Sequence, residues 1–180
     1  MKRISRILPI LAIGVAALAL GWVQLKESRS APPPPVEGGA LASSSASIRM
    51  LLERFLQALH EGDEAKLRQM ALNKLEFKMY VWPHLPSSRP GTNLSADYVW
   101  EQMQPRTRAG FHRTFQDHGG RRYQLEGWSF KKGEKDYGGF VIHGDARISV
   151  FEENGEKRTL NLFGSVIERE GEFKIYSYVR

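Results

Sequence analysis

The sequence predicts an α+β fold in which N-terminal helices pack on a curved antiparallel sheet, preceded by one transmembrane or signal segment. Three observations support this fold class. An apolar run covers residues 7–23, helical apolar spacing begins at Ser47, and from Arg121 onward apolar residues recur with a period of two. These periods are typical of a membrane-length segment, of amphipathic helices and of half-buried strands, respectively.

The apolar run is long enough to approach the width of a bilayer. At about 1.5 Å per residue, residues 7–23 span roughly 25 Å. Lys2, Arg3 and Arg6 precede the run. Basic residues at this position place the N-terminus in the cytoplasm and send the following chain across the membrane. We therefore expect the protein in the bacterial cell envelope, with the membrane as a partner through residues 7–23.

Two interpretations of residues 1–25 remain open. An uncleaved signal anchor is favoured because the run continues through Trp22 and Val23 without a clear processing site, which predicts an inner-membrane protein facing the periplasm. A cleaved signal peptide needs small residues at two positions before the cut, and Ala17 with Ala19 would serve. Cleavage would release the protein into the periplasm.

Residues 26–46 have the composition of a tether. A proline run at Pro32–Pro35 favours a stiff extended chain, and Gly38, Gly39 and the serines Ser43–Ser45 favour a flexible one. Neither composition buries a core. The sequence therefore predicts a linker over 26–46 and one folded domain over 47–180.

Charge and composition exclude several functions. The net charge is +6, but five basic residues precede Ser47, so the folded part has only a small surplus spread along its sequence. This pattern is a solvated surface and not a nucleic-acid interface. The chain has no cysteine, which excludes disulfides, thiolate nucleophiles and thiolate-bound zinc. The histidines show no metal-ligand spacing, and we predict no metal and no cofactor.

Helix signals are clear in the first half of the domain. Ser47 is a plausible N-cap, and Gly62 ends this helix while Asp63 caps the next. The apolar face of the first helix comprises Ile48, Leu51, Leu52, Phe55, Leu56 and Leu59. Ser95 caps a further helix that Pro105 restarts or kinks and that ends at Gly119-Gly120. We expect residues 76–93, rich in aromatics and proline, to form a packing loop.

Four strands follow, with turns at Asn154-Gly155 and Glu170-Gly171. The expected strands are Arg122–Phe130, Gly139–Phe151, Lys157–Glu168 and Phe173–Val179. A three-residue turn with a left-handed Gly155 and a two-residue second turn keep the apolar positions on one face. The pairs that this register predicts are Ile148/Leu160, Ala146/Leu162, Gly144/Gly164, Ile142/Val166, Val166/Ile175, Gly164/Ser177 and Leu162/Val179.

The segment from Phe55 to Asp63, which reads FLQALHEGD, resembles the start of NTF2-like (SnoaL-like) domains. A set of helices followed by long strands up to the C-terminus fits the same resemblance. It implies a curved antiparallel sheet wrapped around helices. The superfamily contains isomerases and cyclases with a pocket Asp or His, non-enzymatic ligand binders and tethered domains of secretion assemblies. The resemblance therefore does not choose a function.

The predicted register places Gly144, Gly164 and Ser177 side by side on the core face. Two interpretations are open. Small residues let a curved sheet bend or admit a helix aromatic such as Trp100, which is favoured, or they form the floor of a cavity. If the cavity exists, its aromatic walls are Tyr80, Trp82 and Trp100.

The same register predicts an outward face that is rather apolar for a wet surface, which suggests a subunit interface. Its members are Val141, His143, Asp145, Phe163, Tyr176 and Tyr178. His143 and Asp145 have the spacing of a base and its orienting acid, but we expect them to point away from a sheltered interior.

The favoured function is a non-enzymatic extracytoplasmic domain, tethered to the membrane, that binds a protein partner or a second copy as a homodimer. Its layout resembles that of bitopic assembly components of type IV secretion. The alternative is an exported small-ligand binder or an isomerase, cyclase or hydrolase that uses a pocket between helices and sheet.

Overall fold

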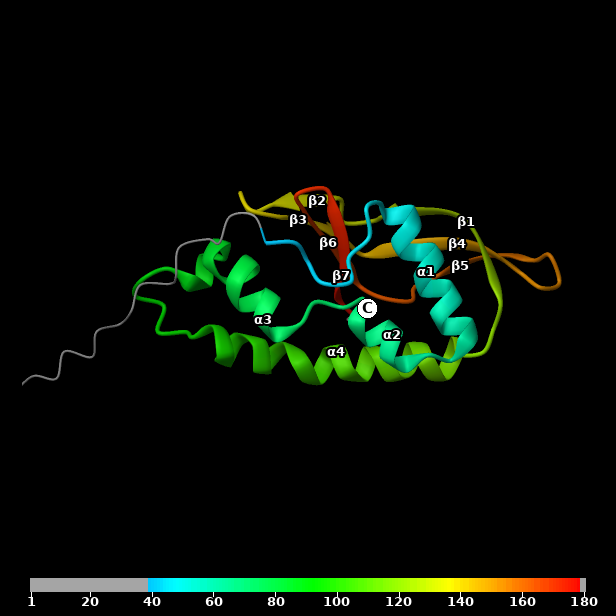
Figure 1. Cartoon of the computed structure of the whole chain (residues 1–180), viewed down its shortest axis with the longest axis horizontal. Coiled ribbons are helices and arrows are strands. Elements are labelled where there is room, and N and C mark those ends of the chain that lie inside the picture. Colours follow the sequence, from blue (N-terminus) through cyan, green and yellow to red (C-terminus); the bar gives the residue numbers. More distant parts are fainter. Residues whose placement is uncertain (1–38, 179–180) are drawn as a thin grey trace, which may run out of the picture.

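The computed structural model describes residues 39–178 of the 180-residue chain. The predicted signal segment and most of the predicted tether lie outside the described residues. Within residues 39–178 no helix is both long and apolar enough to cross a membrane. The fold is α+β, with helices packed on antiparallel sheets, as the sequence predicts, and it is compatible with a cone-like arrangement (Figure 1).

The helix boundaries predicted at Ser47, Gly62 and Asp63 are confirmed. The helical elements are α1 (Ile48–Glu61), α2 (Glu64–Gln69), α3 (Lys74–Glu76), η1 (Phe77–Val81), η2 (Trp82–His84), η3 (Pro86–Ser88) and α4 (Ala96–His118). The Ser47 hydroxyl accepts a hydrogen bond from the Met50 N–H, and the Asp63 carboxylate accepts one from the Lys66 N–H. Gly62 closes α1 in the left-handed conformation, with φ of 68°.

The segment that we expected to be a packing loop is largely helical. Asn73 and Glu76 form a reciprocal capping box that starts α3, and a π-helical turn, η1, continues it. Pro83 and Pro86 then stand in the first turns of two short 3₁₀ helices, where the missing N–H costs nothing. The prolines that suggested a loop therefore start new helical turns.

Helix α4 runs along most of the length of the molecule, below the sheets in the view of Figure 1. The Ser95 hydroxyl caps it by accepting from the Tyr98 N–H, and Gly119 ends it, as predicted. The helix continues unbroken through Pro105, which removes only its own N–H from the backbone ladder.

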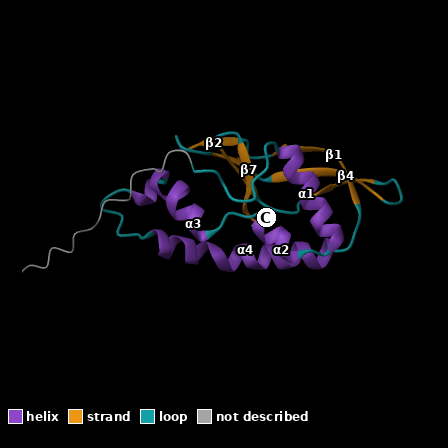
Figure 2. Ribbon diagram, in the orientation of Figure 1, coloured by secondary structure: helices purple, strands orange, loops and turns teal. Residues whose placement is uncertain are grey.

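The strands are shorter and more numerous than the four predicted, and they form two sheets (Figure 2). They are β1 (Tyr123–Phe130), β2 (Glu134–Asp136), β3 (Val141–Gly144), β4 (Ala146–Glu152), β5 (Lys157–Leu160), β6 (Ser165–Arg169) and β7 (Glu172–Ser177). One sheet has the order β1-β4-β5 and the other β2-β3-β6-β7. Two of the predicted strands are thus broken, at Asp145 and over residues 161–164. The charged strand β2 was not expected.

The two turns are as predicted, and the register near them is confirmed. Gly155 is left-handed and closes a three-residue turn, Glu170-Gly171 is a two-residue turn, and Ile148 pairs with Leu160 and Val166 with Ile175. Farther from the first turn the register is wrong by one residue. Ile142 pairs with Ile167 and Gly144 with Ser165.

The slip has a local cause at Asp145. This residue has φ of 59°, a left-handed conformation between β3 and β4. One residue out of the pleat reverses the faces of all residues on one side of it. His143 therefore pairs with Val166 and points toward the interior. The Ala146 N–H donates a hydrogen bond to the Gly164 carbonyl oxygen, so Ala146 does not form the predicted pair with Leu162. The predicted pair of Leu162 with Val179 remains a prediction, because Val179 lies outside the described residues.

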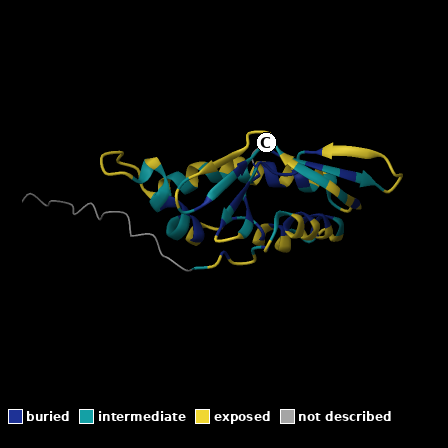
Figure 3. Ribbon diagram, turned by 90° about the horizontal axis from the view of Figure 1, so that it is seen from above, coloured by how far each residue is buried: buried dark blue, intermediate teal, exposed yellow. Residues whose placement is uncertain are grey.

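The sheet that contains β7 contributes to two core clusters. Figure 3 shows that buried positions gather in the middle of the molecule, where helices and strands meet. One core cluster joins α1 to both sheets and includes Phe55, Val166 and Ile175. The other lies under η1 and α4 and includes Phe77 and Ile167. A two-sided core explains why no position of β6 or β7 is exposed.

The folded domain begins earlier than Ser47. Leu41 is buried, and Ser45 exchanges two backbone hydrogen bonds with Phe173, at 2.8 and 2.9 Å. The Ala42 N–H donates to Glu76 Oε1 at 2.7 Å. Residues 39–46, which the sequence assigned to the tether, therefore pack on the domain as an added edge of β7.

Candidate functional site

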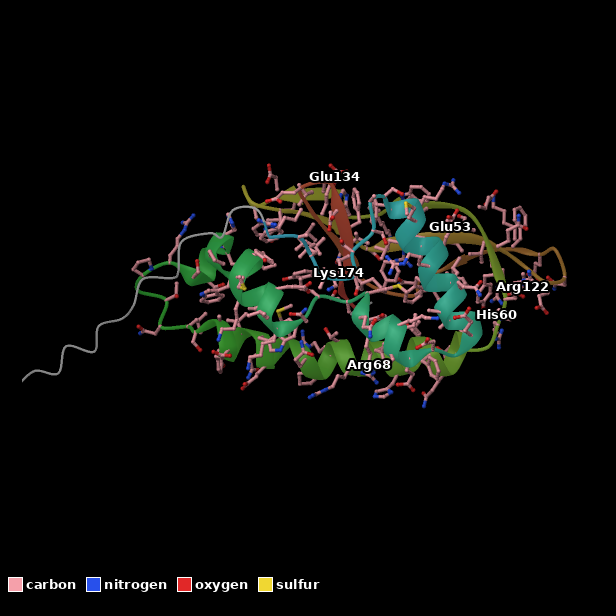
Figure 4. All side chains as sticks on the ribbon, in the orientation of Figure 1. Glu53, His60, Arg68, Arg122, Glu134 and Lys174 are labelled. Atoms are coloured by element: carbon pink, nitrogen blue, oxygen red, sulfur yellow. The ribbon has the colours of Figure 1, made fainter. Side chains whose placement is uncertain are left out.

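A buried ion pair connects α3 to β7. Lys174 is 1% exposed, and its Nζ lies 2.8 Å from both carboxylate oxygens of Glu76. The same carboxylate accepts the N–H groups of Ala42 and Asn73. Figure 4 shows Lys174 at the centre of the molecule. Every oxygen of Glu76 is used to join three segments, so this cluster is structural.

His143 was expected on an exposed face, but it is buried. Its Nε2 lies 2.8 Å from Glu168 Oε2 and its Nδ1 lies 3.2 Å from Glu134 Oε1, although this second contact lacks hydrogen-bond geometry. The ring packs against Phe130 and Phe173. The histidine thus connects β2 to β6 across β3. Among the described residues no group of three acidic or histidine side chains could hold a metal ion.

The residues that we predicted to line one pocket do not come together. Trp82 is 5% exposed and packs in the core beside Phe77. Tyr80 lies under the Arg169 guanidinium. Gly144 faces Lys132 and is not beside Gly164, because of the register slip at Asp145. The Gly164 N–H donates a backbone hydrogen bond to the Ser177 carbonyl oxygen. Of the predicted row of small residues, only the neighbours Gly164 and Ser177 are therefore confirmed.

The predicted interface is also divided between inside and outside. Phe163 is fully buried against Phe55, and Tyr178 is buried with its hydroxyl donating to the Leu67 carbonyl oxygen. Val141 and Asp145 are half-buried and remain near the surface. Phe163 lies in the break between β5 and β6. Tyr176 has no partner in the β6–β7 pairing, because Ser165 pairs with Ser177 and Val166 with Ile175. The side-chain alternation expected for continuous strands therefore fails at both places.

Two open hollows flank the first half of α4 and share Met103, Thr107 and Tyr176. The α2–α4 hollow, of about 160 Å³, is lined by Arg68, Ala71, Leu72, Trp100, Met103, Gln104, Thr107, Arg108, Phe111, Tyr176 and Tyr178. The α4–β7 hollow, of about 360 Å³, is lined by Tyr98, Val99, Gln102, Met103, Arg106, Thr107, Tyr176 and Ser177. Of the predicted site residues, Trp100, Tyr176, Ser177 and Tyr178 line one or both.

The first half of α4 is incompletely covered by the rest of the domain. No residue from Ala96 to Ala109 is fully buried, although Val99, Trp100 and Met103 are apolar. Tyr98 is 53% exposed. Met103 and Thr107 were not predicted as site residues. Together with Val99 they recur every four residues, and this helical spacing was the signal in the sequence that could have found them.

A third hollow, of about 880 Å³, lies at the other end of the molecule between α1 and strands β1 and β4. Glu53, His60 and Arg122 line it and are labelled in Figure 4. Its charged residues have both signs, and Arg49 already binds Glu53. This mixture gives no preference for one class of ligand.

Ser177 tests whether the α4–β7 hollow is open space. Replacement of Ser177 by valine adds methyl groups toward this hollow, so we expect the free energy of unfolding to stay unchanged or to rise by up to about 1 kcal/mol. Urea unfolding measures the change, with Ser177→Ala as the control for the hydroxyl. A loss of about 1–3 kcal/mol with valine alone would mean that the position is tightly packed.

Comparison with known proteins finds no match to this chain among family models, curated proteins or solved structures.

Proposed function

We propose that this chain is a non-enzymatic domain, tethered to the membrane on the extracytoplasmic side, that binds a polypeptide beside α4. The observation that carries the proposal is the incomplete burial of Val99, Trp100 and Met103 next to two open hollows. Apolar surface of this kind, bordered by polar residues, is typical of protein interaction sites. The polypeptide is a partner protein or a second copy of the chain.

The size of the α2–α4 hollow favours a side chain over a small-molecule substrate. The α2–α4 hollow holds about 160 Å³. A cavity of about 150 Å³ accommodates a single benzene ring. Small-molecule sites usually enclose about 300–1,000 Å³. An anchoring aromatic or aliphatic side chain of a partner suits the hollow, as in many interfaces where a few buried anchors supply most of the affinity.

The tether and the location rest on the N-terminal sequence, whose residues 1–38 lie outside the described part. The NTF2-like assignment is likewise a proposal, supported by the α+β arrangement of helices packed on antiparallel sheets. The alternative, an exported small-ligand binder or enzyme, has support from the volumes of the larger hollows, since the hollow between α1 and strands β1 and β4 holds about 880 Å³. The α4–β7 hollow, at about 360 Å³, reaches the lower size range of small-molecule sites.

Site-specific photo-crosslinking distinguishes the two candidates. With benzoylphenylalanine in place of Gln102, which lines the α4–β7 hollow, we expect one discrete polypeptide adduct in the native cell. The same probe at Asn154, in the exposed turn after β4, is the control and should give none. An adduct of twice the chain mass identifies a second copy. Equal adducts at both positions, or none at Gln102 with a small molecule co-purifying, contradict the proposal.

A further inference from the structure

Every charged side chain that lines the hollows beside α4 is an arginine. Arg68 and Arg108 line the α2–α4 hollow, and Arg106 lines the α4–β7 hollow. Figure 4 shows Arg68 where α2 meets α4. Its guanidinium lies over the Phe111 ring, 4.1 Å from the centroid. Neither hollow is lined by an aspartate or a glutamate.

Of the three arginines, Arg68 is already paired with a carboxylate, and the acidic side chains in the first turns of α4 are paired with lysines. Glu64 binds Arg68 at 3.0 Å, and Glu101 lies 3.6 Å from Lys74. Asp97 pairs with both Lys74 and Lys78, a contact that lowers the pKa of its carboxyl. Within the described part of the chain, Arg106 and Arg108 pair with no carboxylate. Their charges therefore remain available to a bound molecule.

The neutral polar groups of the hollows also suit an anion. Gln104 and Thr107 both carry hydrogen-bond donors. The Tyr176 hydroxyl is protonated at physiological pH, and burial raises its pKa further, to about 12. The hollows thus combine apolar lining with donors and positive charge, and no aspartate or glutamate lines them.

We infer that the segment bound beside α4 belongs to a partner protein and is acidic as well as apolar. This inference rests on the proposed function and deepens it. An aromatic or aliphatic anchor enters the α2–α4 hollow, while carboxylates on either side of the anchor lie against Arg108 and Arg106. These two arginines stand on opposite flanks of the Met103–Thr107 line, and a guanidinium binds a carboxylate through two parallel hydrogen bonds.

Three short fluorescent peptides test the inference against the full chain in detergent. They share the same tryptophan and leucine positions and carry glutamate, glutamine or lysine elsewhere. By fluorescence anisotropy we expect the glutamate peptide to bind about three- to tenfold more tightly than the glutamine peptide, and the lysine peptide to bind most weakly. This preference should shrink at high salt, because exposed charges are screened.

Two paired variants make the result specific. Arg106→Gln with Arg108→Gln should abolish the preference for glutamate, so that the glutamate and glutamine peptides bind this variant with equal affinity. Arg113→Gln with Lys131→Gln removes the same charge from exposed positions that line neither hollow, and should keep the preference.

Several outcomes overturn the inference. They are equal affinity for the three peptides, no binding of any peptide, and a preference for glutamate that survives Arg106→Gln with Arg108→Gln. A crosslink from Gln102 to a second copy also overturns it. Partner binding is judged separately, by that crosslink itself, which forms whatever the charge of the partner. The two proposals therefore fail independently.

Discussion

Replacement of Lys174 by methionine is expected to lower the free energy of unfolding by about 3–5 kcal/mol. The substitution keeps an unbranched, largely apolar stem, with a thioether sulfur in place of one methylene, and removes the ammonium group. It leaves the Glu76 carboxylate buried without a counter-charge, since both of its oxygens lie 2.8 Å from Lys174 Nζ. Urea unfolding followed by circular dichroism measures the loss.

A double-mutant cycle separates the pair from its surroundings. Glu76→Gln alone should also destabilise, because it leaves the ammonium buried, and Glu76→Gln with Lys174→Met should cost less than the sum of the two. Lys157→Met is the matched control. Its pair with Glu126 is exposed and its loss should cost less than about 1 kcal/mol. If Lys174→Met costs no more than the control, the buried pair does not hold α3 and residues 39–46 to β7.

The second large effect concerns Phe163. Phe163→Ala should cost about 3–5 kcal/mol, because the ring is 0% exposed and its removal leaves a cavity in the core. The ring packs edge-on against Phe55, with 5.2 Å between centroids. Phe163→Asp should give no folded domain, since a carboxylate would be buried there without a partner.

Tyr98→Asp is the control for Phe163→Asp. Tyr98 is 53% exposed on α4, and the change should alter stability by no more than about 0.5 kcal/mol. Circular dichroism and thermal unfolding compare the two variants. A folded Phe163→Asp protein would restore the interpretation that this residue lies on an outward interface.

Much of the local structure was predictable because it depends on neighbouring residues. Ser47, Asp63 and Ser95 cap helices through contacts within three residues, and Gly155 and Gly171 occupy turns that need positive φ. The register beside each turn followed from the same chemistry. Such features need no knowledge of the rest of the chain.

The candidate site was only partly predictable. Trp100 and Ser177 were named as pocket residues, and Tyr176 as an interface residue, yet all three line hollows beside α4. The arginines carried no signal of their own, because a charge on an amphipathic helix usually faces solvent. Their importance appears only when α2, α4 and β7 are brought together.

The sequence by itself was enough to predict the α+β class, the helix caps and the hairpin turns. Only the tertiary structure decided which faces of the sheet are buried. The left-handed Asp145 reverses side-chain parity, so His143 turns inward, where its ring packs against Phe130 and Phe173. Side-chain alternation carries information only along an unbroken strand, and breaks are stabilised by packing between segments far apart in the chain.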